Sequence, residues 1–502
     1  MQKIFMDTRK LDAQARNNFD LSEDLMMENA AAALEAKILS HVFSEDGHYI
    51  SRPAVLILAG SGNNGADGFA LARRLIDHRI AVTVCEIDPP KSPMCIIQKN
   101  RAIKNGVQTN DVYQLDEYIE SKSFDLRVIA DCIFGSGFHG ELPYHAAAVI
   151  EQVNQVTDAY KIACDIPTGI DMNGNISGLA FKADETVTMG ALKYALFNDA
   201  AKDYCGKITC SNLGVSRCNF EHSAEIIPEA LLLEEDDLEL PYRNKKQNVN
   251  KGSFGHTAVI AGEKEGAAII AAEAALRTGS GLSTVVSSRT DIHIPYELMH
   301  SSAFPENTTA AALGMGLGRN NPDAQKYIAF LIENPEIACV LDADIFYHPE
   351  IKTLLQTRPC KTILTPHPKE FSALLENCGL GKYSVKEIQQ RRLELSKEFC
   401  KSFPETVLIL KGANVIISQK FTARPKVDSY INTFGTAALA KAGSGDVLSG
   451  IAASFLAQGQ SPLEAAVNAS LAHAIAGSRI TPDFSLTPFK LIEGIEKLDS
   501  IN

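Results

Sequence analysis

The stretch Pro53-Ala-Val-Leu-Ile-Leu-Ala-Gly-Ser-Gly-Asn-Asn-Gly-Ala-Asp-Gly68 decides the fold class of the first half of the chain. Its continuous apolar run, Pro53 to Ala59, is typical of a strand that is buried on both faces in a parallel sheet. A glycine-rich turn follows, and we expect a helix from Phe69 to Ile76. A strand, a glycine-rich turn and a helix form a phosphate-binding βα unit, which predicts an α/β fold with its ligand at the strand ends.

Polar side chains crowd the turn that follows this strand. Asn63, Asn64 and Asp67 lie among four glycines. An Asn side chain offers both donors and a carbonyl oxygen, which suits a ribose, an amide or a hard cation. The alternative is a polar turn in which Asn adopts the left-handed conformation.

Two more expected strands end in similar loops. Leu126 to Phe134 carries Asp131 near its end, and Tyr160 to Ile166 carries Asp165. The loop Gly135 to Glu141 follows the first, and Pro167-Thr168-Gly169 follows the second. Because the carboxyl ends of parallel strands meet at one edge, we expect a single ligand-binding edge. Lys193 can reach this edge or remain a solvated surface lysine.

These motifs resemble the successive signatures of NAD(P)H-hydrate epimerases, and Leu25-Met-Met-Glu-Asn29 is similar as well. The resemblance implies a Rossmann-like α/β/α domain, with Asp165 handling the proton at the hydrated carbon. It implies that a hydrated nicotinamide nucleotide is bound by Asn63, Asn64, Gly65, Ala66, Asp67, Gly135, Ser136, Gly137, Phe138, His139, Gly140, Glu141 and Asp165. It also implies a potassium ion (K+) held by Asn64, Asp131 and Thr168, and oxygen ligands suit such a hard cation. Two departures remove no functional group: Ala66 stands where the family commonly has Gly, and Ala30 to Ala33 replace the usual Ala-Gly.

The second half also alternates strands and helices, which predicts another layered α/β domain. Three glycines end the run from Ala311 to Gly318, and Cys339 to Asp344 reads as a strand bearing two carboxylates. In Ala442-Gly-Ser-Gly-Asp-Val-Leu-Ser-Gly450 we expect a helix that begins at Asp446. Free amides at such a start bind anions, and a carboxylate there can take a proton from a hydroxyl. A glycine-rich turn merely capped by Asp446 is the alternative.

The order of these pieces resembles the ribokinase-like superfamily, and more narrowly the ADP-dependent NAD(P)H-hydrate dehydratases. The motifs include Lys251 to His256, Thr365-Pro-His-Pro-Lys-Glu-Phe371, Lys411-Gly-Ala and Gly443-Ser-Gly-Asp446. The resemblance implies that Asp446 lies at the site of phosphoryl transfer, where it would act as the base, and we expect magnesium (Mg2+) as the charge partner in that step. It implies that Ala267, Gly316, His367 and Asp446 line the hydrated nucleotide. It further implies that Lys411, Gly412, Ala413, Asn414, Val415 and Gly445 hold the adenine nucleotide.

Together the motifs predict two domains, residues 1–220 and 221–502, in one bifunctional enzyme. The resemblance implies that the first domain interconverts the R and S forms of hydrated NADH and NADPH (NADHX and NADPHX). The second would dehydrate the S form while ADP becomes AMP and phosphate. The alternative is a ribokinase-like kinase for a vitamin precursor, with a first half that only binds or dimerises.

Composition narrows the classes of protein. At 502 residues the chain is too long to fold around one ordinary hydrophobic core, so we expect more than one domain. A net charge of −13 disfavours non-specific binding to nucleic acid. The sequence has no apolar stretch of membrane-spanning length and no apolar signal core, so we expect a cytoplasmic protein. Eleven cysteines without a Cys-x-x-Cys motif are typical of buried thiols in a reducing compartment. We also expect the protein to form a homo-oligomer.

Overall fold

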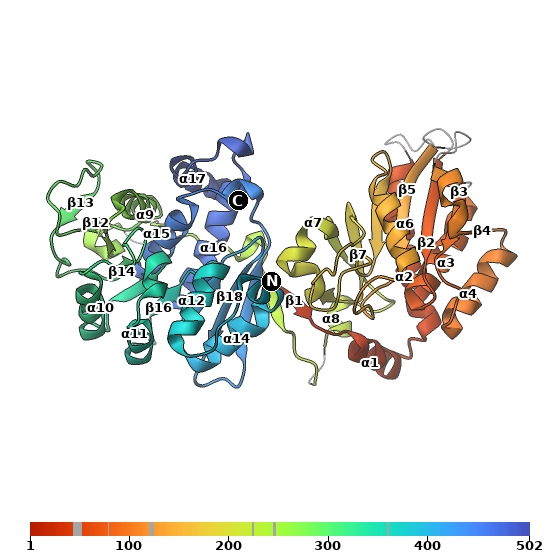
Figure 1. Ribbon diagram of the computed structural model, residues 1–502, viewed down its shortest axis with the longest axis horizontal. Coiled ribbons are helices and arrows are strands. Elements are labelled where there is room, and N and C mark those ends of the chain that lie inside the picture. Colours follow the sequence, from red (N-terminus) through yellow and green to blue (C-terminus); the bar gives the residue numbers. More distant parts are fainter. Residues whose placement is uncertain are drawn as a thin grey trace. The chain divides into compact units, whose positions relative to one another are not determined.

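A computed structural model describes residues 1–43, 53–78, 80–119, 125–222, 225–243, 247–358 and 361–501. The fold divides into two compact units. The N-terminal unit is Lys3–Glu229, and the C-terminal unit is Ala230–Asn502 together with Met1 and Gln2. Figure 1 shows the first in red to yellow and the second in green to blue.

A parallel sheet with the strand order β4-β3-β2-β5-β6-β7-β9 forms the centre of the N-terminal unit. Its strands are β2 (Pro53–Ala59), β3 (Ala81–Glu86), β4 (Gln108–Asp111), β5 (Asp125–Cys132), β6 (Tyr160–Cys164), β7 (Glu185–Met189) and β9 (Lys207–Ser211). The short strands β1 (Gln2–Phe5) and β8 (Leu192–Lys193) pair in parallel with each other. The chain reverses direction across the sheet between β2 and β5, and this reversal is where ligands bind in open α/β sheets.

Helices cover both faces of this sheet. They are α1 (Arg9–Phe19), α2 (Glu23–Val42), α3 (Asn63–Leu75), α4 (Pro93–Lys104), α5 (Leu115–Ile119), α6 (Tyr144–Asn154), α7 (Lys202–Cys205) and α8 (Arg217–Phe220). Alternate residues of β2 enter different cores: Val55 and Ile57 pack with α2 and α3, whereas Leu56 and Leu58 pack with α6. A strand buried on both faces needs a continuous apolar run, which explains the sequence Pro53 to Ala59.

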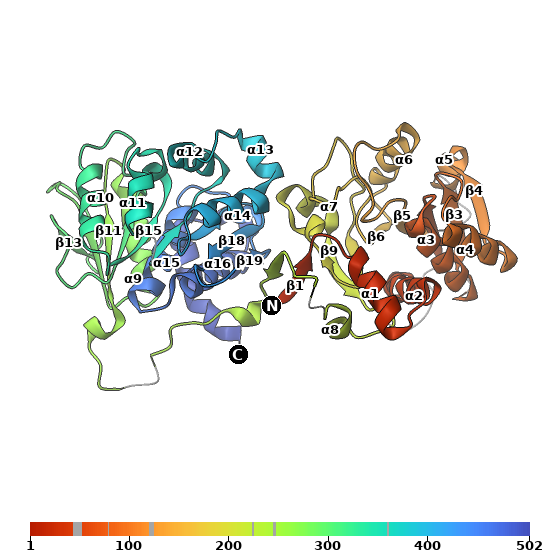
Figure 2. The same cartoon turned by 90° about the horizontal axis from the view of Figure 1, so that it is seen from below.

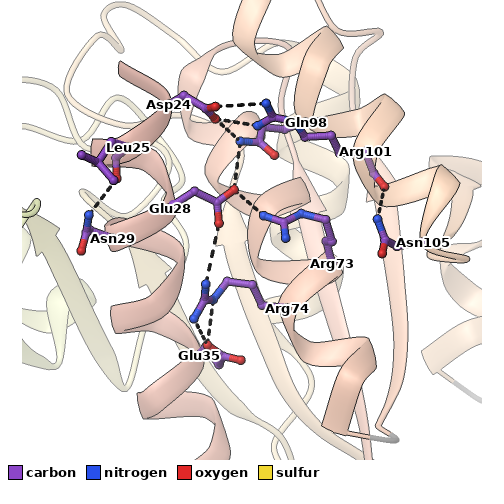
Figure 3. A network of polar contacts seen from close by, with 10 residues as sticks. All are labelled: Asp24, Leu25, Glu28, Asn29, Glu35, Arg73, Arg74, Gln98, Arg101 and Asn105. Carbon is purple, nitrogen blue, oxygen red and sulfur yellow. Dashed lines mark hydrogen bonds and ion pairs between the residues drawn. The ribbon is translucent and has the colours of Figure 1, made fainter. Parts of the chain in front are cut away.

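A network of ion pairs joins α2 to its neighbours α3 and α4 (Figure 3). Arg74 of α3 pairs with Glu35 at 2.7 Å, and Arg101 of α4 pairs with Asp24 at 2.6 Å. Glu28 of α2 accepts from Arg73. Ser22 caps the start of α2, because its hydroxyl accepts a hydrogen bond from the amide of Leu25. This network holds the last turn of α3, at the end of the helix away from Asn63 and Asn64.

The C-terminal unit has a mixed sheet with the strand order β13-β12-β11-β14-β15-β16-β17-β18-β19-β10. Its strands are β10 (Ala230–Leu232), β11 (His256–Ile260), β12 (Leu282–Val286), β13 (Met299–Ser301), β14 (Ala310–Leu313), β15 (Ala338–Leu341), β16 (Thr362–Leu364), β17 (Val407–Leu410), β18 (Val415–Lys420) and β19 (Val427–Asn432). The pairs from β13 to β17 are parallel, and β17-β18 and β18-β19 are antiparallel. The predicted layered α/β domain is therefore confirmed.

Helices again lie on both faces of the sheet. Figure 2 shows α10, α11, α12 and α14 along one face and α9, α15 and α16 along the other. The helices are α9 (Glu265–Arg277), α10 (Ala324–Glu333), α11 (Ile351–Thr357), α12 (Pro368–Cys378), α13 (Val385–Gln390), α14 (Arg392–Ser402), α15 (Ser444–Ala457), α16 (Pro462–Ser478) and α17 (Pro488–Gly494). Small residues let α9 and α15 approach closely: a Cβ on Gly450 would lie 2.1 Å from the carbonyl oxygen of Ala271. Within the described ranges, no helix has the length and apolarity needed to cross a bilayer.

Several predicted boundaries were wrong. The strand expected from Leu126 to Phe134 ends at Cys132, and the strand expected from Tyr160 to Ile166 ends at Cys164. Helix α3 begins at Asn63, not at Phe69, and α15 begins at Ser444, not at Asp446. Glycine and Asn in a first turn read as loop because both have low helix propensity. Strand β15 ends at Leu341, so Asp342 follows the strand and caps the short helix Ala343–Tyr347.

Candidate functional site

Asp131 and Thr168 lie in contact at the ends of neighbouring strands in the N-terminal unit. Asp131 is fully buried, and its two oxygens accept from the amide of Thr168 at 2.7 Å and from its hydroxyl at 2.8 Å. Burial raises the pKa of Asp131 to about 6, against the hydrogen bonds from Thr168 that lower it. This pair is an oxygen-rich buried cluster.

Asp165 follows β6 with a backbone φ of 71°, a left-handed conformation that few non-glycine residues adopt. Its carboxylate accepts from the amides of Ser136 and Met189, each at 3.2 Å. The ammonium of Lys193 lies 2.6 Å away. Burial alone would raise the pKa of Asp165, but the Lys193 charge and these hydrogen bonds bring it below its ordinary value. Asp165 is therefore a charged carboxylate held in one position.

Asp67, in the first turns of α3, has a pKa that is shifted in the opposite direction from that of Asp165. Burial raises its pKa well above the ordinary value, and the negative charge of Asp165 adds to the effect. The pKa values of Asp67 and Asp165 are therefore shifted in opposite directions, the pattern in which one carboxyl group serves as acid and the other as base.

Gly135 lies between the predicted site residues. A Cβ at this position would be 3.1 Å from Oδ2 of Asp165 and 3.3 Å from Oδ1 of Asn64. Within the described ranges, Nδ2 of Asn64 is buried and has no hydrogen-bond partner. A buried donor without a partner is costly, so this amide is suited to a ligand acceptor. We call Asn64, Asp67, Asp131, Asp165, Thr168 and Lys193 the first site.

Not every predicted substrate residue faces the first site through its side chain. Asn63 donates to Glu23 of α2 at 2.7 Å. Ala66 is fully buried in the core. A Cβ on Gly65 would lie 1.9 Å from the carbonyl oxygen of Gly60, and one on Gly60 would lie 2.1 Å from that of Ile133. These residues shape the turn through their backbone.

The predicted loop Gly135 to Glu141 borders the first site with its first residues. Ser136 donates to Asp165, and the amide of Phe138 donates to the carbonyl of Gly135 at 3.0 Å. His139 contacts the carbonyl of Gly137 at 3.1 Å. The rest of the loop, including Gly140 and Glu141, is exposed.

In the C-terminal unit, Asp446 stands in the first turn of α15 and is half-buried. Burial raises the pKa of Asp446 to about 7; the charge of Asp342 adds to this and that of Lys411 opposes it. The first-turn amides of a helix have no partner inside the helix, so they are available to an anion. A base poised near neutrality therefore stands beside an anion-binding backbone.

Lys411 links two carboxyl groups beside this helix start. Its ammonium lies 2.8 Å from Oδ1 of Asp342 and 3.6 Å from Oε2 of Glu370. Asp342 is buried and accepts a second strong hydrogen bond, at 2.7 Å, from Ser449 of α15. A Cβ on Gly445 would lie 3.3 Å from the Lys411 ammonium, so this cation is next to the anion-binding turn. Lys411 is consequently no ordinary surface lysine.

His367 caps α12 and lies at the edge of the same group. Its Nδ1 accepts from the amides of Lys369 and Glu370, and its Nε2 is 3.2 Å from Glu370. Burial lowers the pKa of His367, and the Lys411 charge lowers it further. Its imidazole remains partly exposed toward solvent.

The other predicted residues of the C-terminal unit belong to two groups. Gly316 has a φ of 60°, and a Cβ there would lie 3.1 Å from that of Ala267. In the Lys411–Val415 loop, Gly412 and Ala413 are exposed, whereas Asn414 is buried. The buried Arg392 donates to the carbonyl of Asn414 at 2.8 Å and so anchors this loop. We call Ala267, Gly316, Asp342, His367, Glu370, the Lys411–Val415 loop and Gly445–Asp446 the second site.

Three residues of the two sites had no assigned role in the sequence: Lys193, Asp342 and Glu370. For Lys193 the sequence left two alternatives, a lysine that reaches the ligand-binding edge and a solvated surface lysine. The side chain is 3% exposed, which excludes the surface alternative and places Lys193 in the first site. Asp342 and Glu370 lay inside quoted motifs, but only the fold places both beside Lys411. Their signal in the sequence was a carboxylate at, or soon after, the end of a predicted parallel strand.

Comparisons with known proteins match both halves. The family model described as YjeF-related protein N-terminus matches residues 23–195, and that described as NAD(P)H-hydrate dehydratase matches residues 257–497. The bifunctional NAD(P)H-hydrate repair enzyme Nnr of Helicobacter pylori is 41% identical over 99% of this chain and 100% of its own length. Its namesake in Coxiella burnetii is 32% identical over 85% of each chain.

A solved ADP/ATP-dependent NAD(P)H-hydrate dehydratase from Bacillus subtilis, co-crystallised with ATP and Mg2+, is 24% identical. It covers 54% of this chain and 98% of its own, with a TM-score of 0.43. The full-length relatives do not favour the alternative of a vitamin-precursor kinase with a non-catalytic first half. This chain belongs to the family of bifunctional NAD(P)H-hydrate repair enzymes, which join an epimerase to a dehydratase.

Proposed function

We propose that the first site epimerises NADHX and NADPHX and that the second site dehydrates the S epimer at the expense of ADP. The observation that carries the assignment is the placement of the two carboxylates: Asp165 lies 2.6 Å from the buried Lys193 ammonium, and Asp446 stands in the first turn of α15 at the anion-binding start of that helix. Family membership supports the substrate class.

Epimerisation inverts a carbon that carries a hydroxyl group. The carbon–oxygen bond breaks as the oxygen takes up a proton and leaves as water, while the ring nitrogen supplies an electron pair to the carbon. Water then adds to the opposite face and loses a proton. Asp165 accepts this proton, and Lys193 stabilises its charged form between turnovers. Asp67, whose pKa is raised by burial, supplies the proton to the departing oxygen. The unpartnered amide of Asn64 donates to the bound nucleotide.

Dehydration requires hydroxide, a poor leaving group, to depart. Asp446 removes the hydroxyl proton, and the oxygen attacks the terminal phosphorus of ADP, so the bond to AMP breaks. The phosphate ester then leaves as phosphate, and a neighbouring carbon loses a proton to restore the ring double bond. The amides of Gly445 and Asp446, with the Lys411 ammonium, hold the transferring phosphoryl group.

Metal ions fit both proposals through the chemistry of the donors. Asp131, Thr168 and Asn64 offer a carboxylate, a hydroxyl and an amide carbonyl, which are the oxygen donors that suit K+. Mg2+ takes much of its coordination from nucleotide phosphates and water. The carboxylate of Glu370 would hold it, and bound Mg2+ would neutralise charge on the phosphates.

One assay tests the whole assignment. The purified protein receives each hydrated NADH epimer separately, with and without ADP, and the return of reduced-nicotinamide absorbance is followed. We expect repair of both epimers only when ADP is present. Repair of the S epimer alone, beyond the spontaneous background, would refute the role of the first site. A small-molecule kinase would restore no absorbance from either epimer.

Replacing Lys193 by Met is expected to lower the rate of epimerisation by about 100-fold. The change leaves Asp165 buried without its counter-ion, and removing one partner of a buried ion pair costs about 3–5 kcal/mol of folding stability. The measurements are epimer interconversion and thermal unfolding. Lys182→Met, at an exposed position of the same unit, serves as the control. Unchanged epimerisation in Lys193→Met would contradict the role given to Lys193.

The dehydration rate is expected to fall with acidity. Asp446 acts as a base, its pKa is about 7, and its charged form disappears as the pH drops through that value. The rate at pH 6 should be about ten-fold below that at pH 8. Epimerisation should change little over this range, because the pKa of Asp165 is below its ordinary value. Initial rates of the two reactions across this range check the prediction, and parallel profiles would contradict it.

That the protein works in the cytoplasm and assembles into a homo-oligomer stays a prediction.

A further inference from the structure

His473 of α16 lies against the first turn of α15 and has no role in the chemistry above. Its Nε2 is 2.9 Å from the carbonyl oxygen of Ser444 and 3.0 Å from the Ser444 hydroxyl. A carbonyl oxygen only accepts, so Nε2 carries the proton and donates it. Burial lowers the pKa of His473 to about 4, so the imidazole is neutral at physiological pH.

The carbonyl that His473 holds belongs to the same peptide unit as the amide of Gly445. The peptide unit is planar and trans, so its C=O and N–H point in opposite directions. When His473 fixes the direction of the Ser444 carbonyl, it therefore also fixes the opposite direction, in which the Gly445 N–H points. That direction matters, because Gly445 lies next to the Lys411 ammonium at the start of the helix.

The rest of the turn is anchored on the other side. The amide of Ser444 donates to the carbonyl of Lys441 at 3.2 Å. Gly443 has a φ of 88°, and a Cβ there would lie 2.5 Å from Pro488, so the chain enters α15 along one path. His473 supplies the remaining side-chain constraint on the Ser444–Gly445 peptide.

We propose that His473 is a positioning residue for dehydration: through the Ser444 carbonyl it aims the Gly445 amide at the phosphoryl group in transfer. This role rests on the proposed function of the second site. A donor that is aimed before the reaction stabilises developing charge without reorganisation, so its loss should lower kcat more than it raises KM.

The test compares two amide side chains of different reach. In His473→Gln the amide nitrogen stands near the position of Nε2, and in His473→Asn it stands near that of Nδ1. We expect His473→Asn to lower kcat for ADP-dependent dehydration by about 10–100-fold, with KM for ADP changed less than about three-fold. His473→Gln should recover kcat to within about three-fold of the wild type. Epimerisation, in the other unit, should be the same in both variants.

Two results would overturn the proposal. One is a kcat in His473→Asn within about three-fold of the wild type. The other is a His473→Gln variant that loses as much kcat as His473→Asn while both show the same fall in thermal stability, because that pattern indicates packing alone. The wild type separates this inference from the function on which it rests. A wild type without ADP-dependent dehydration would refute the function, whereas an active wild type with unaffected variants would refute only the role of His473.

Discussion

Replacing Asp446 by Asn is expected to lower the rate of ADP-dependent dehydration by about 1,000-fold and to leave epimerisation unchanged. The amide keeps the size of the side chain and its place in the first turn of α15, but it cannot accept the hydroxyl proton. The anion-binding amides and Lys411 remain, so ADP should still bind. A loss of turnover with retained nucleotide affinity is the signature of a missing base, not of a missing binding site.

The measurement is single-turnover dehydration of the S epimer together with calorimetric titration of ADP. Asp236→Asn, an exposed carboxylate of the same unit, provides the matched control and should behave as the wild type. The more drastic Asp446→Ala should lose the same activity. If ADP-dependent repair persisted in either Asp446 variant, another residue would have to be the base.

The second large effect is expected at Asp165. Asp165→Asn should lower epimerisation by about 100- to 1,000-fold while the S epimer is still dehydrated at the normal rate. Asn is the informative replacement, because Asp165 has a φ of 71° and Asn is among the few residues that adopt this conformation readily. Alanine would add backbone strain to the loss of charge and so confuse the two effects.

Interconversion of the epimers, followed by chromatography, measures the effect directly. Asp158→Asn, at an exposed position of the same unit, is the control. A coupled test uses the R epimer with ADP: repair should slow to the spontaneous rate of epimerisation. Retained enzymatic epimerisation in Asp165→Asn would show that Asp165 is not the group that moves the proton.

Local patterns made the fold class and the position of both sites predictable. Pro53 to Ala59 had to be buried on both faces, and that alone requires helices on each side of the sheet. The strand-end rule then brought Asp131 and Asp165 to one edge. The sequence did not predict which charged side chains lie close together in the fold, nor how they shift one another's pKa values. The opposite pKa shifts of Asp67 and Asp165 arise from burial and from Lys193, which is distant in sequence.

The helix starts were missed for a related reason. Asn63 to Gly65 and Ser444-Gly445 have poor helix propensity, so sequence alone assigns them to loops. Tertiary packing overrides propensity where a helix terminus has to approach a ligand. His473 could not be recognised from the sequence either. A His on an apolar helix is read as a core residue until its hydrogen-bond partner, Ser444, is known.

The close backbone contacts of Gly60 and Gly65 have a thermodynamic consequence. Each of these glycines leaves no room for a side chain against the neighbouring carbonyl, so the turn is fixed by steric fit. A turn that is already ordered loses little conformational entropy when a nucleotide arrives, whereas ordering a free backbone costs about 1–2 kcal/mol per residue. Binding energy is then left for distortion and orientation at the reacting carbon.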